Sequence, residues 1–156
     1  MLETGLESIS YNLNRRNNHL QLFEFGKTYY SEAVGQYLEK EHLCLYSSGR
    51  ITEDSWREKS KEHDFFRLKG LAIALFELCG LANIRFQQTA EDGVEIAVFN
   101  GNQLIGKLTE VAKKKLNSFD IKQPVFVLDI LFEQLLGEVE KTKIQHKNRL
   151  LNIKTV

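Results

Sequence analysis

The residues best suited to chemistry in this chain are its carboxylates, histidines and cysteines, and Glu24 is the most unusual of them. It lies in the apolar run LQLFEFGKTYYSE, residues 20–32, two residues before a glycine. General acid–base catalysis needs a second group that receives or supplies the proton, and the sequence offers none nearby. Strand alternation places Glu24 on one face with Leu20 and Leu22. We therefore expect Glu24 to be a structural anchor that forms hydrogen bonds with backbone amides or with Arg15 or Arg16.

The remaining candidate groups indicate neither a metal site nor a nucleophile. Cys44 and Cys79 lie in apolar contexts without a C-x-x-C partner, which predicts buried free thiols in a reducing compartment. The acidic pair Asp129 and Glu133 is typical of a solvated surface. No phosphate-binding glycine loop or nucleophile elbow is present in the sequence. The four histidines are far apart, so we expect surface side chains: His19, His42, His63 and His146.

Composition restricts the class of protein further. The chain has 156 residues, of which 42% are hydrophobic, so it is one ordinary domain or a piece of a larger protein. Lys plus Arg and Asp plus Glu are both 21, which leaves no net field to attract nucleic acid or an anionic membrane. No segment resembles a signal peptide or a membrane span. We expect a cytoplasmic protein, and an RNA-binding module is disfavoured.

Hydrophobic spacing predicts the elements of the first half of the chain. In chain order we expect an amphipathic helix over 3–16, strands over 20–30 and 41–46, a solvated loop over 52–63 that contains Trp56, and a helix over 64–80. Asp64 is the expected cap of the second helix and Gly80 its stop. Its buried stripe is predicted to comprise Phe65, Leu68, Ala72, Leu75 and Cys79, widened by Leu71 and Leu78.

The second half predicts strands and short helices. A strand is expected over 84–88, followed by a hairpin whose arms, 94–100 and 102–110, flank Asn100-Gly101. A short helix capped by Thr109 follows, and then a strand from Pro124 that runs into a final helical turn near residue 136. This order predicts an α+β fold in which an antiparallel sheet is flanked by helices.

Two phrases carry a family resemblance. Residues 11–30, YNLNRRNNHLQLFEFGKTYY, followed by residues 64–77, DFFRLKGLAIALFE, resemble the core domain of the beta subunit of bacterial phenylalanyl-tRNA synthetase. The L-F-E-x-G and D-F-F-x-L-K-G phrases occur in the family's order. The resemblance assigns residues 1–143 to this core domain and leaves 144–156 as a divergent or truncated tail. Glu110-Val111 departs from the His-Pro pair that is usual in the family.

The resemblance implies the fold of a class II aminoacyl-tRNA synthetase catalytic domain without its activity. Active members end their second motif in G-x-x-F-R-x-E, where the arginine clamps the ATP α-phosphate. Setting GKTYYSE against that phrase puts Tyr30 in the place of the arginine and Glu32 on the glutamate. The glycine-rich third motif has no counterpart. We therefore expect Glu24, Gly26, Tyr30 and Glu32 to be structural, with no catalytic residue and no metal ligand in this chain.

By resemblance, the chain is a non-catalytic structural core that packs against the catalytic alpha subunit. The whole enzyme would be a heterotetramer of two alpha–beta pairs that binds ATP and magnesium and charges tRNA(Phe) with phenylalanine; this chain alone would bind no cofactor. In class II folds the first-motif helix and its neighbouring strand form the dimer interface. The interface expected here comprises Leu6, Ile9, Tyr11, Leu13, Leu22, Phe23 and Phe25. The alternative is a stand-alone class II synthetase paralogue that binds a small ligand.

Overall fold

The computed structural model describes residues 1–33, 36–50, 63–89 and 95–153, with side chains described for all of these except 32, 33, 36 and 145–153. Its centre is a six-stranded sheet of order β1-β2-β6-β5-β4-β3 in which every neighbouring pair is antiparallel. The strands are β1 (His19–Ala33), β2 (Gln36–Gly49), β3 (Ile84–Gln88), β4 (Glu95–Asn100), β5 (Gln103–Glu110) and β6 (Val125–Leu131). The helices are α1 (Leu2–Leu13), α2 (Phe65–Leu78), α3 (Lys113–Asn117) and α4 (Phe132–Ile153). The α+β prediction is confirmed.

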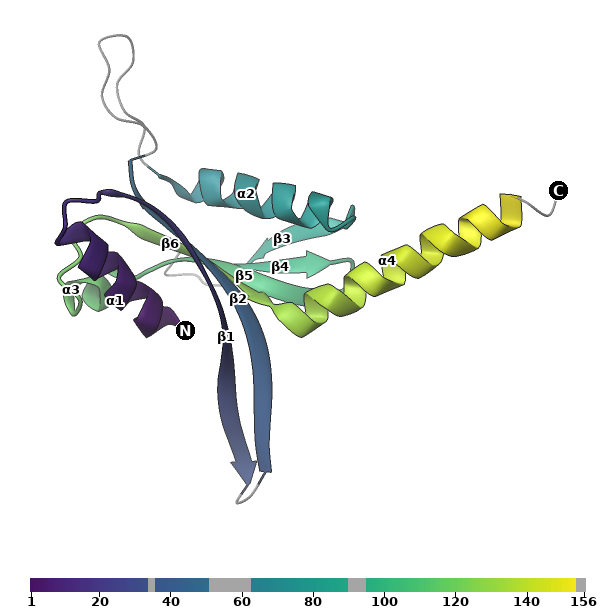
Figure 1. Cartoon of the computed structure of the whole chain (residues 1–156), viewed down its shortest axis with the longest axis horizontal. Helices are drawn as coiled ribbons and strands as arrows, with labels where there is room; N and C mark the ends of the chain where they lie inside the picture. The colour runs from purple at the N-terminus through teal and green to yellow at the C-terminus, as the bar shows by residue number, and fades with distance from the viewer. Residues whose placement is uncertain (34–35, 51–62, 90–94, 154–156) are drawn as a thin grey trace, which may run out of the picture.

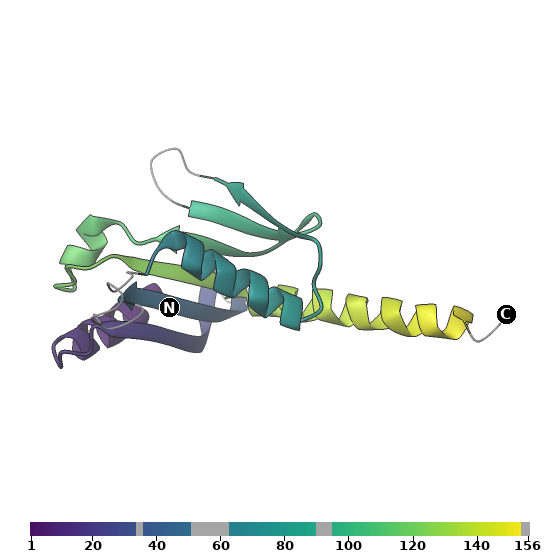
Figure 2. The same ribbon diagram turned by 90° about the horizontal axis from the view of Figure 1, so that it is seen from above.

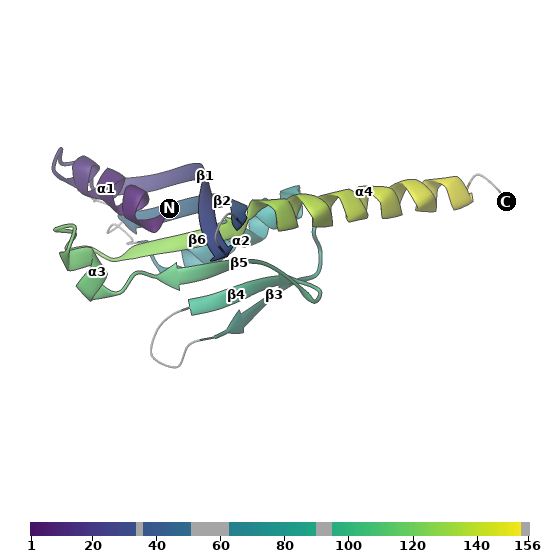
Figure 3. The ribbon, with the colours of Figure 1, turned by 90° about the horizontal axis from the view of Figure 1, so that it is seen from below.

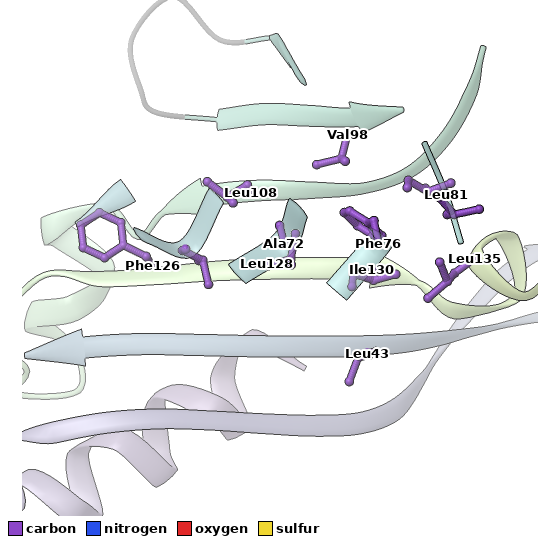
Figure 4. Close-up of a cluster of buried hydrophobic side chains, with 12 residues drawn as sticks. Leu43, Ala72, Phe76, Leu81, Val98, Leu108, Phe126, Leu128, Ile130 and Leu135 are labelled. Atoms are coloured by element: carbon purple, nitrogen blue, oxygen red, sulfur yellow. The ribbon is translucent and has the colours of Figure 1, made fainter. Parts of the chain in front are cut away.

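Each face of the sheet has its own hydrophobic core. On one face, which we call the α2 face, α2 and the start of α4 pack on the sheet, and α2 lies in front of the strands in Figure 2. Figure 4 shows Ala72 and Phe76 of α2 beside Leu128 and Ile130 of β6. The opposite face, the α1 face, carries α1 and the α3 region and is seen in Figure 3. The strands therefore alternate between two cores, which explains why β6 is apolar at every position except Asp129.

Local signals set the bounds of α2 as expected. The Asp64 carboxylate accepts a hydrogen bond from the backbone N–H of Arg67 at 2.7 Å, and Gly80 adopts a left-handed φ of 79° just after the helix. Leu71 and Leu78 were expected to widen the buried stripe, and this prediction is wrong because both side chains are exposed. The sheet contacts one side of α2, so an apolar residue on the other side faces solvent.

The hairpin prediction is confirmed, whereas the expected cap of the short helix is wrong. Asn100 pairs with Gln103 across a tight turn, and Gly101 has a φ of 58°. Thr109 was expected to cap the following helix, but it belongs to β5 and pairs with Val127 of β6. The ladder hydrogen bonds to β6 keep Thr109 in an extended backbone, which a helix cap at this position would interrupt.

Three elements, α4, β1 and β2, are longer than predicted. The final helical turn expected near residue 136 is a 22-residue helix, α4, which projects from the sheet (Figure 1). The proposed boundary at residue 143 falls inside this helix and stays a prediction. β1 and β2 also project as a hairpin, because β6 pairs only with residues 42–48 of β2. The expected solvated loop over 52–63, with Trp56, lies outside the described residues except for His63, which is buried.

Candidate interaction surface

The projecting part of the β1–β2 hairpin exposes large side chains on both of its faces. We call residues 27–33 and 36–41 the arm; each strand here has only the other as a neighbour among the described strands. Its exposed apolar side chains are Tyr29, Tyr30, Tyr37 and Leu38. Lys27 forms ion pairs with Glu39 and Glu41 across the two strands. A two-stranded ribbon is marginally stable in water, so these exposed rings make the arm a candidate interaction surface.

A row of aromatic rings runs from the arm toward the body of the sheet. Phe23 is 72% exposed and Phe25 is 58% exposed. Their ring centroids lie 6.3 Å apart in an edge-to-face arrangement, and the Phe25 ring stands 5.2 Å from that of Phe132 at the start of α4. Phe25 pairs with Leu43, so this row lies on the α2 face, outside the area that α2 covers. With Tyr29 it forms what we call the aromatic row of β1.

The structure divides the predicted interface residues into three groups, which are buried, half-buried and exposed. Leu6 and Ile9 are 0% exposed, so the prediction that they contact a partner is wrong. Both side chains fill the core between α1 and the sheet, because the apolar stripe of α1 has the sheet of its own chain to pack on. Leu13 and Leu22 are half-buried against the same cluster. The three others are exposed and stay candidates for contact: Tyr11, Phe23 and Phe25.

Glu24 is half-buried on the α1 face, and its partner differs from the expected ones. The hydroxyl of Thr4 lies 3.1 Å from both oxygens of the Glu24 carboxylate and 2.7 Å from the carbonyl oxygen of Met1. The expectation of an arginine partner is wrong for Arg15, whose guanidinium instead stacks 3.4 Å over the Tyr11 ring. Glu24 thus links β1 to the first turn of α1, the position of a structural anchor.

The other second-motif positions have ordinary structural surroundings. A side chain at Gly26 would meet the sulfur of Met1 at 2.3 Å, so the flexible Met1 side chain would have to move to make room for it. Tyr30 is exposed on the arm, with the ammonium of Lys40 5.2 Å from its ring. The Glu32 side chain lies outside the described ones. The roles of these residues remain predictions.

A buried polar chain on the α1 face was missed by the sequence reasoning. His42 is buried, with Nδ1 2.7 Å from Oδ1 of Asp129 and Nε2 2.9 Å from the hydroxyl of Thr28. The expected surface position of His42 is therefore wrong, as is the expected solvated position of Asp129. The Cys44 thiol lies 3.6 Å from the same Asp129 oxygen, and burial raises the pKa of Cys44 to about 12. Cys44 is thus a buried free thiol, as the sequence predicted.

A cavity of about 350 Å³ lies next to Cys44 and Asp129. It is lined by Met1, Cys44, Tyr46, Thr109, Lys115 and Asp129, among others. The Tyr46 hydroxyl donates to the Met1 carbonyl at 2.9 Å. The two lysines of the lining have carboxylate partners: Lys115 lies 2.5 Å from Glu3, and Lys107 lies 4.0 Å from Glu95. These cationic groups are therefore satisfied within the chain.

His63 is the second histidine that the sequence wrongly placed on the surface. It lies just before α2, where Nδ1 is 2.7 Å from the hydroxyl of Ser47 and the backbone N–H donates to the carbonyl of Gly49. Burial, and then the nearby Arg67 guanidinium, lower the pKa of the His63 imidazole. The ring therefore favours its neutral form. Periodicity could not reveal this position, because His63 ends a charged stretch of sequence that has no apolar period.

The outer side of α2 is a further exposed surface that the sequence reasoning assigned to the core. Phe66 is 77% exposed and Leu78 is 87% exposed, with Leu71 between them. Gly70 lies on the same side, and apart from its chain neighbours and the backbone of its own helix no atom of the described residues comes within 4 Å of the Cβ position there. In the part of the chain that the structure describes, there is no group of three His, Cys, Asp or Glu side chains placed to hold a metal ion. No described helix is long and apolar enough to span a membrane.

Comparison with known proteins decides the family. The model of the phenylalanyl tRNA synthetase beta chain CLM domain matches residues 1–132. The chain belongs to this family. A phenylalanine–tRNA ligase beta subunit from Bacteroides fragilis is 28% identical over 94% of the chain, and one from Syntrophotalea carbinolica is 31% identical over 84%. These matches confirm the family resemblance. The chain spans only 20% and 17% of the lengths of these two relatives.

The fold is shared with a solved synthetase. The structure of PylSc, a pyrrolysyl tRNA synthetase from Desulfitobacterium hafniense, matches with a TM-score of 0.65 and 20% sequence identity. The match covers 90% of this chain and 49% of that chain. The expected class II synthetase-like core, an antiparallel sheet with flanking helices, is confirmed.

Proposed function

We propose that this chain is a non-catalytic structural core domain of a phenylalanine–tRNA ligase beta subunit, which packs against the catalytic alpha subunit. The observation that carries this proposal is the aromatic row of β1, formed by Phe23, Phe25 and Tyr29. Exposed aromatic side chains on one face of a strand are typical of the core of a protein–protein interface. β1 is also an edge strand among the described strands, so a partner can approach it from the side as well as from its face.

The lack of catalysis is supported by the residues on the α1 face. Tyr30 stands where an active second motif has its arginine, and a phenol cannot provide a permanent cation for the ATP α-phosphate. Glu24 is engaged by Thr4 rather than aimed at an open site. The lysines of the neighbouring cavity are paired with Glu3 and Glu95. This arrangement favours a scaffold over the alternative of a small-ligand binder.

In the whole enzyme we propose a cytoplasmic heterotetramer of two alpha–beta pairs. ATP, magnesium and phenylalanine would bind to the alpha subunit, and tRNA(Phe) would bind to the assembled enzyme. The chain covers about a fifth of its beta-subunit relatives, so the remaining modules of such a subunit would lie outside this sequence.

The test is co-expression with the alpha subunit from the same organism, followed by affinity capture and an ATP titration. We expect the wild-type chain to retain the alpha subunit and the isolated chain not to bind ATP. Phe23→Ser and Tyr29→Ser should reduce capture at least tenfold, because both rings are exposed and their loss leaves the core intact. Gly70→Leu on α2 is the matched control and should retain capture. ATP binding without alpha-subunit capture would overturn the proposal.

A further inference from the structure

A groove of about 590 Å³ lies between α2 and the strand β3 at one edge of the sheet. β3 is the last strand at the end opposite β1, as Figure 3 shows, and β4 is its only neighbour among the described strands. The groove is lined by one side of α2, by the turn after α2 and by β3. Its lining includes Lys69, Ile73, Glu77, Ala82, Ile84 and Phe86.

The hydrogen bonds of β3 show which of its backbone groups face the open edge. At one end the N–H of Gly101 donates to the carbonyl of Asn83 at 3.0 Å, and at the other end the N–H of Thr89 donates to the carbonyl of Glu95 at 3.1 Å. In an antiparallel pair, residues bonded to the neighbouring strand alternate with residues whose N–H and C=O groups point away from it. The odd-numbered residues of β3 therefore face β4, and the even-numbered ones face outward.

Ile84 and Phe86 combine an outward-facing backbone with an apolar side chain in the groove. Both side chains are half-buried against the core of the α2 face. An extended segment laid beside β3 would form hydrogen bonds with the N–H and C=O groups of both residues. It would also place every second side chain over the groove, because side chains on one face of a sheet recur with a period of two. One added strand would therefore use the edge and the groove together.

Two charged side chains at the groove indicate the chemistry of such a segment. The ammonium of Lys69 lies 4.7 Å from the ring centroid of Phe86, and Glu77 is exposed about two helical turns further along α2. Neither Lys69 nor Glu77 forms an ion pair within the part of the chain that the structure describes. An apolar segment with an acidic residue beside Lys69 and a basic residue beside Glu77 would complement both charges.

We propose that the β3 edge and its groove receive an extended strand from the same beta subunit, from a part that lies outside this sequence. This inference rests on the proposed function in one respect, that the chain is a domain of a longer subunit. The chain spans 20% of the length of the Bacteroides fragilis relative, which leaves most of a comparable subunit to supply the strand. An edge this short is much smaller than a standard interface between free proteins, so a tethered segment, with its high effective concentration, is favoured.

The first test is hydrogen exchange of the individual β3 amides, measured by mass spectrometry with electron-transfer fragmentation. In this chain alone we expect slow exchange at Arg85 and Gln87, which face β4, and fast exchange at Ile84 and Phe86. In the whole alpha–beta enzyme from the same organism, the amides of Ile84 and Phe86 should exchange at least tenfold more slowly. Arg85 and Gln87 serve as the internal reference. Equally fast exchange at Ile84 and Phe86 in both samples would overturn the proposal.

The second test identifies the source of the strand. Ala82 is exposed and lines the groove, so photoreactive p-benzoylphenylalanine can be incorporated there in the whole enzyme. We expect a cross-link to a beta-subunit peptide outside this sequence, formed within one chain and therefore without a new band of higher mass on a denaturing gel. A cross-link to the alpha subunit, or to a second beta subunit, would overturn the proposal.

Charge reversal in the groove tests the recognition chemistry. Lys69→Glu should make the amides of Ile84 and Phe86 exchange at least fivefold faster than in the wild-type enzyme, because it sets a carboxylate against the acidic residue of the strand. Lys69→Arg should retain the protection. Lys114→Glu, an exposed charge reversal on α3, is the matched control, and circular dichroism of each isolated variant verifies folding. Full protection in the Lys69→Glu enzyme would overturn the proposal.

The strand pairing and the proposed function fail in different ways. β3 and β1 lie at opposite edges of the sheet, so an alpha subunit on the aromatic row of β1 leaves the groove accessible. Capture of the alpha subunit together with fast exchange at Ile84 and Phe86 would overturn the strand pairing alone. Slow exchange at both amides in the whole enzyme, with the expected cross-link but no capture of the alpha subunit by this chain, would overturn the proposed packing against that subunit alone.

Discussion

His42 of β2 and Asp129 of β6 are joined through Nδ1 and Oδ1 at 2.7 Å, although the two residues are 87 positions apart in the chain. Thr28 extends the link to β1, because its hydroxyl lies 2.9 Å from the other ring nitrogen of His42. The three strands are therefore connected by side chains as well as by the backbone ladder. The strand pairing that places β6 beside β2 is what creates this polar chain.

Removal of the Asp129 carboxylate should destabilise the fold. Asp129→Ala leaves Nδ1 of the buried His42 ring without its carboxylate partner, and we expect the free energy of unfolding to fall by about 1–3 kcal/mol. Urea unfolding followed by circular dichroism measures this change. Glu133→Ala, which removes the exposed neighbour at the start of α4, should stay within about 0.5 kcal/mol of the wild type. Equal effects of the two substitutions would contradict a structural role for the hydrogen bond between His42 and Asp129.

The cap of α2 should contribute measurably to stability. Asp64→Ala removes the acceptor of the Arg67 backbone N–H, with an expected loss of about 1 kcal/mol in the free energy of unfolding. Thr109→Ala is the comparison, because that residue lies within β5 and caps no helix in the described structure. Its effect should be smaller than that of Asp64→Ala in the same urea experiment. The reverse order would show that the cap assignment is wrong.

His63 should make stability depend on pH in the acidic range. Its pKa is lowered from the ordinary 6.5 in the folded chain, so the unfolded chain binds a proton more readily. The contribution of the neutral ring is complete above about pH 6.5 and is lost as the pH falls from there through the folded pKa. Urea unfolding at pH 7.5 and 5.5 should show a smaller decrease for His63→Gln than for the wild type. An identical decrease would exclude His63 as the source.

Two glycine substitutions in helices should have opposite effects. Gly70→Ala should stabilise α2 by about 0.5–1 kcal/mol, because alanine is the better helix former and the site is open. Gly5→Ala in α1 should be destabilising, since its new methyl group would lie 2.2 Å from the Tyr46 ring. Thermal unfolding compares the two. Destabilisation by both would mean that Gly70 is packed against its own chain.

Local patterns were sufficient where neighbouring residues determine the backbone. Asp64 and Gly80 bound α2, and Asn100-Gly101 turns the β4–β5 hairpin, because a cap, a stop and a tight turn each depend on a few adjacent residues. The family phrases also led to the correct fold class. The start of α3 was not predictable in this way, because the ladder to β6 holds Thr109 in β5.

The sequence by itself determined the order and type of the elements and the family of this protein, since these depend on short runs of residue types, whereas it missed the lengths of α4, β1 and β2. The tertiary structure alone decided which apolar side chains are buried. Leu6 and Leu78 are both leucines on amphipathic helices, yet Leu6 is 0% exposed and Leu78 is 87% exposed. The difference arises because the sheet covers one side of each helix, and no local pattern states which side that is. The same assembly buried His42 beside Asp129 and left the aromatic row of β1 exposed.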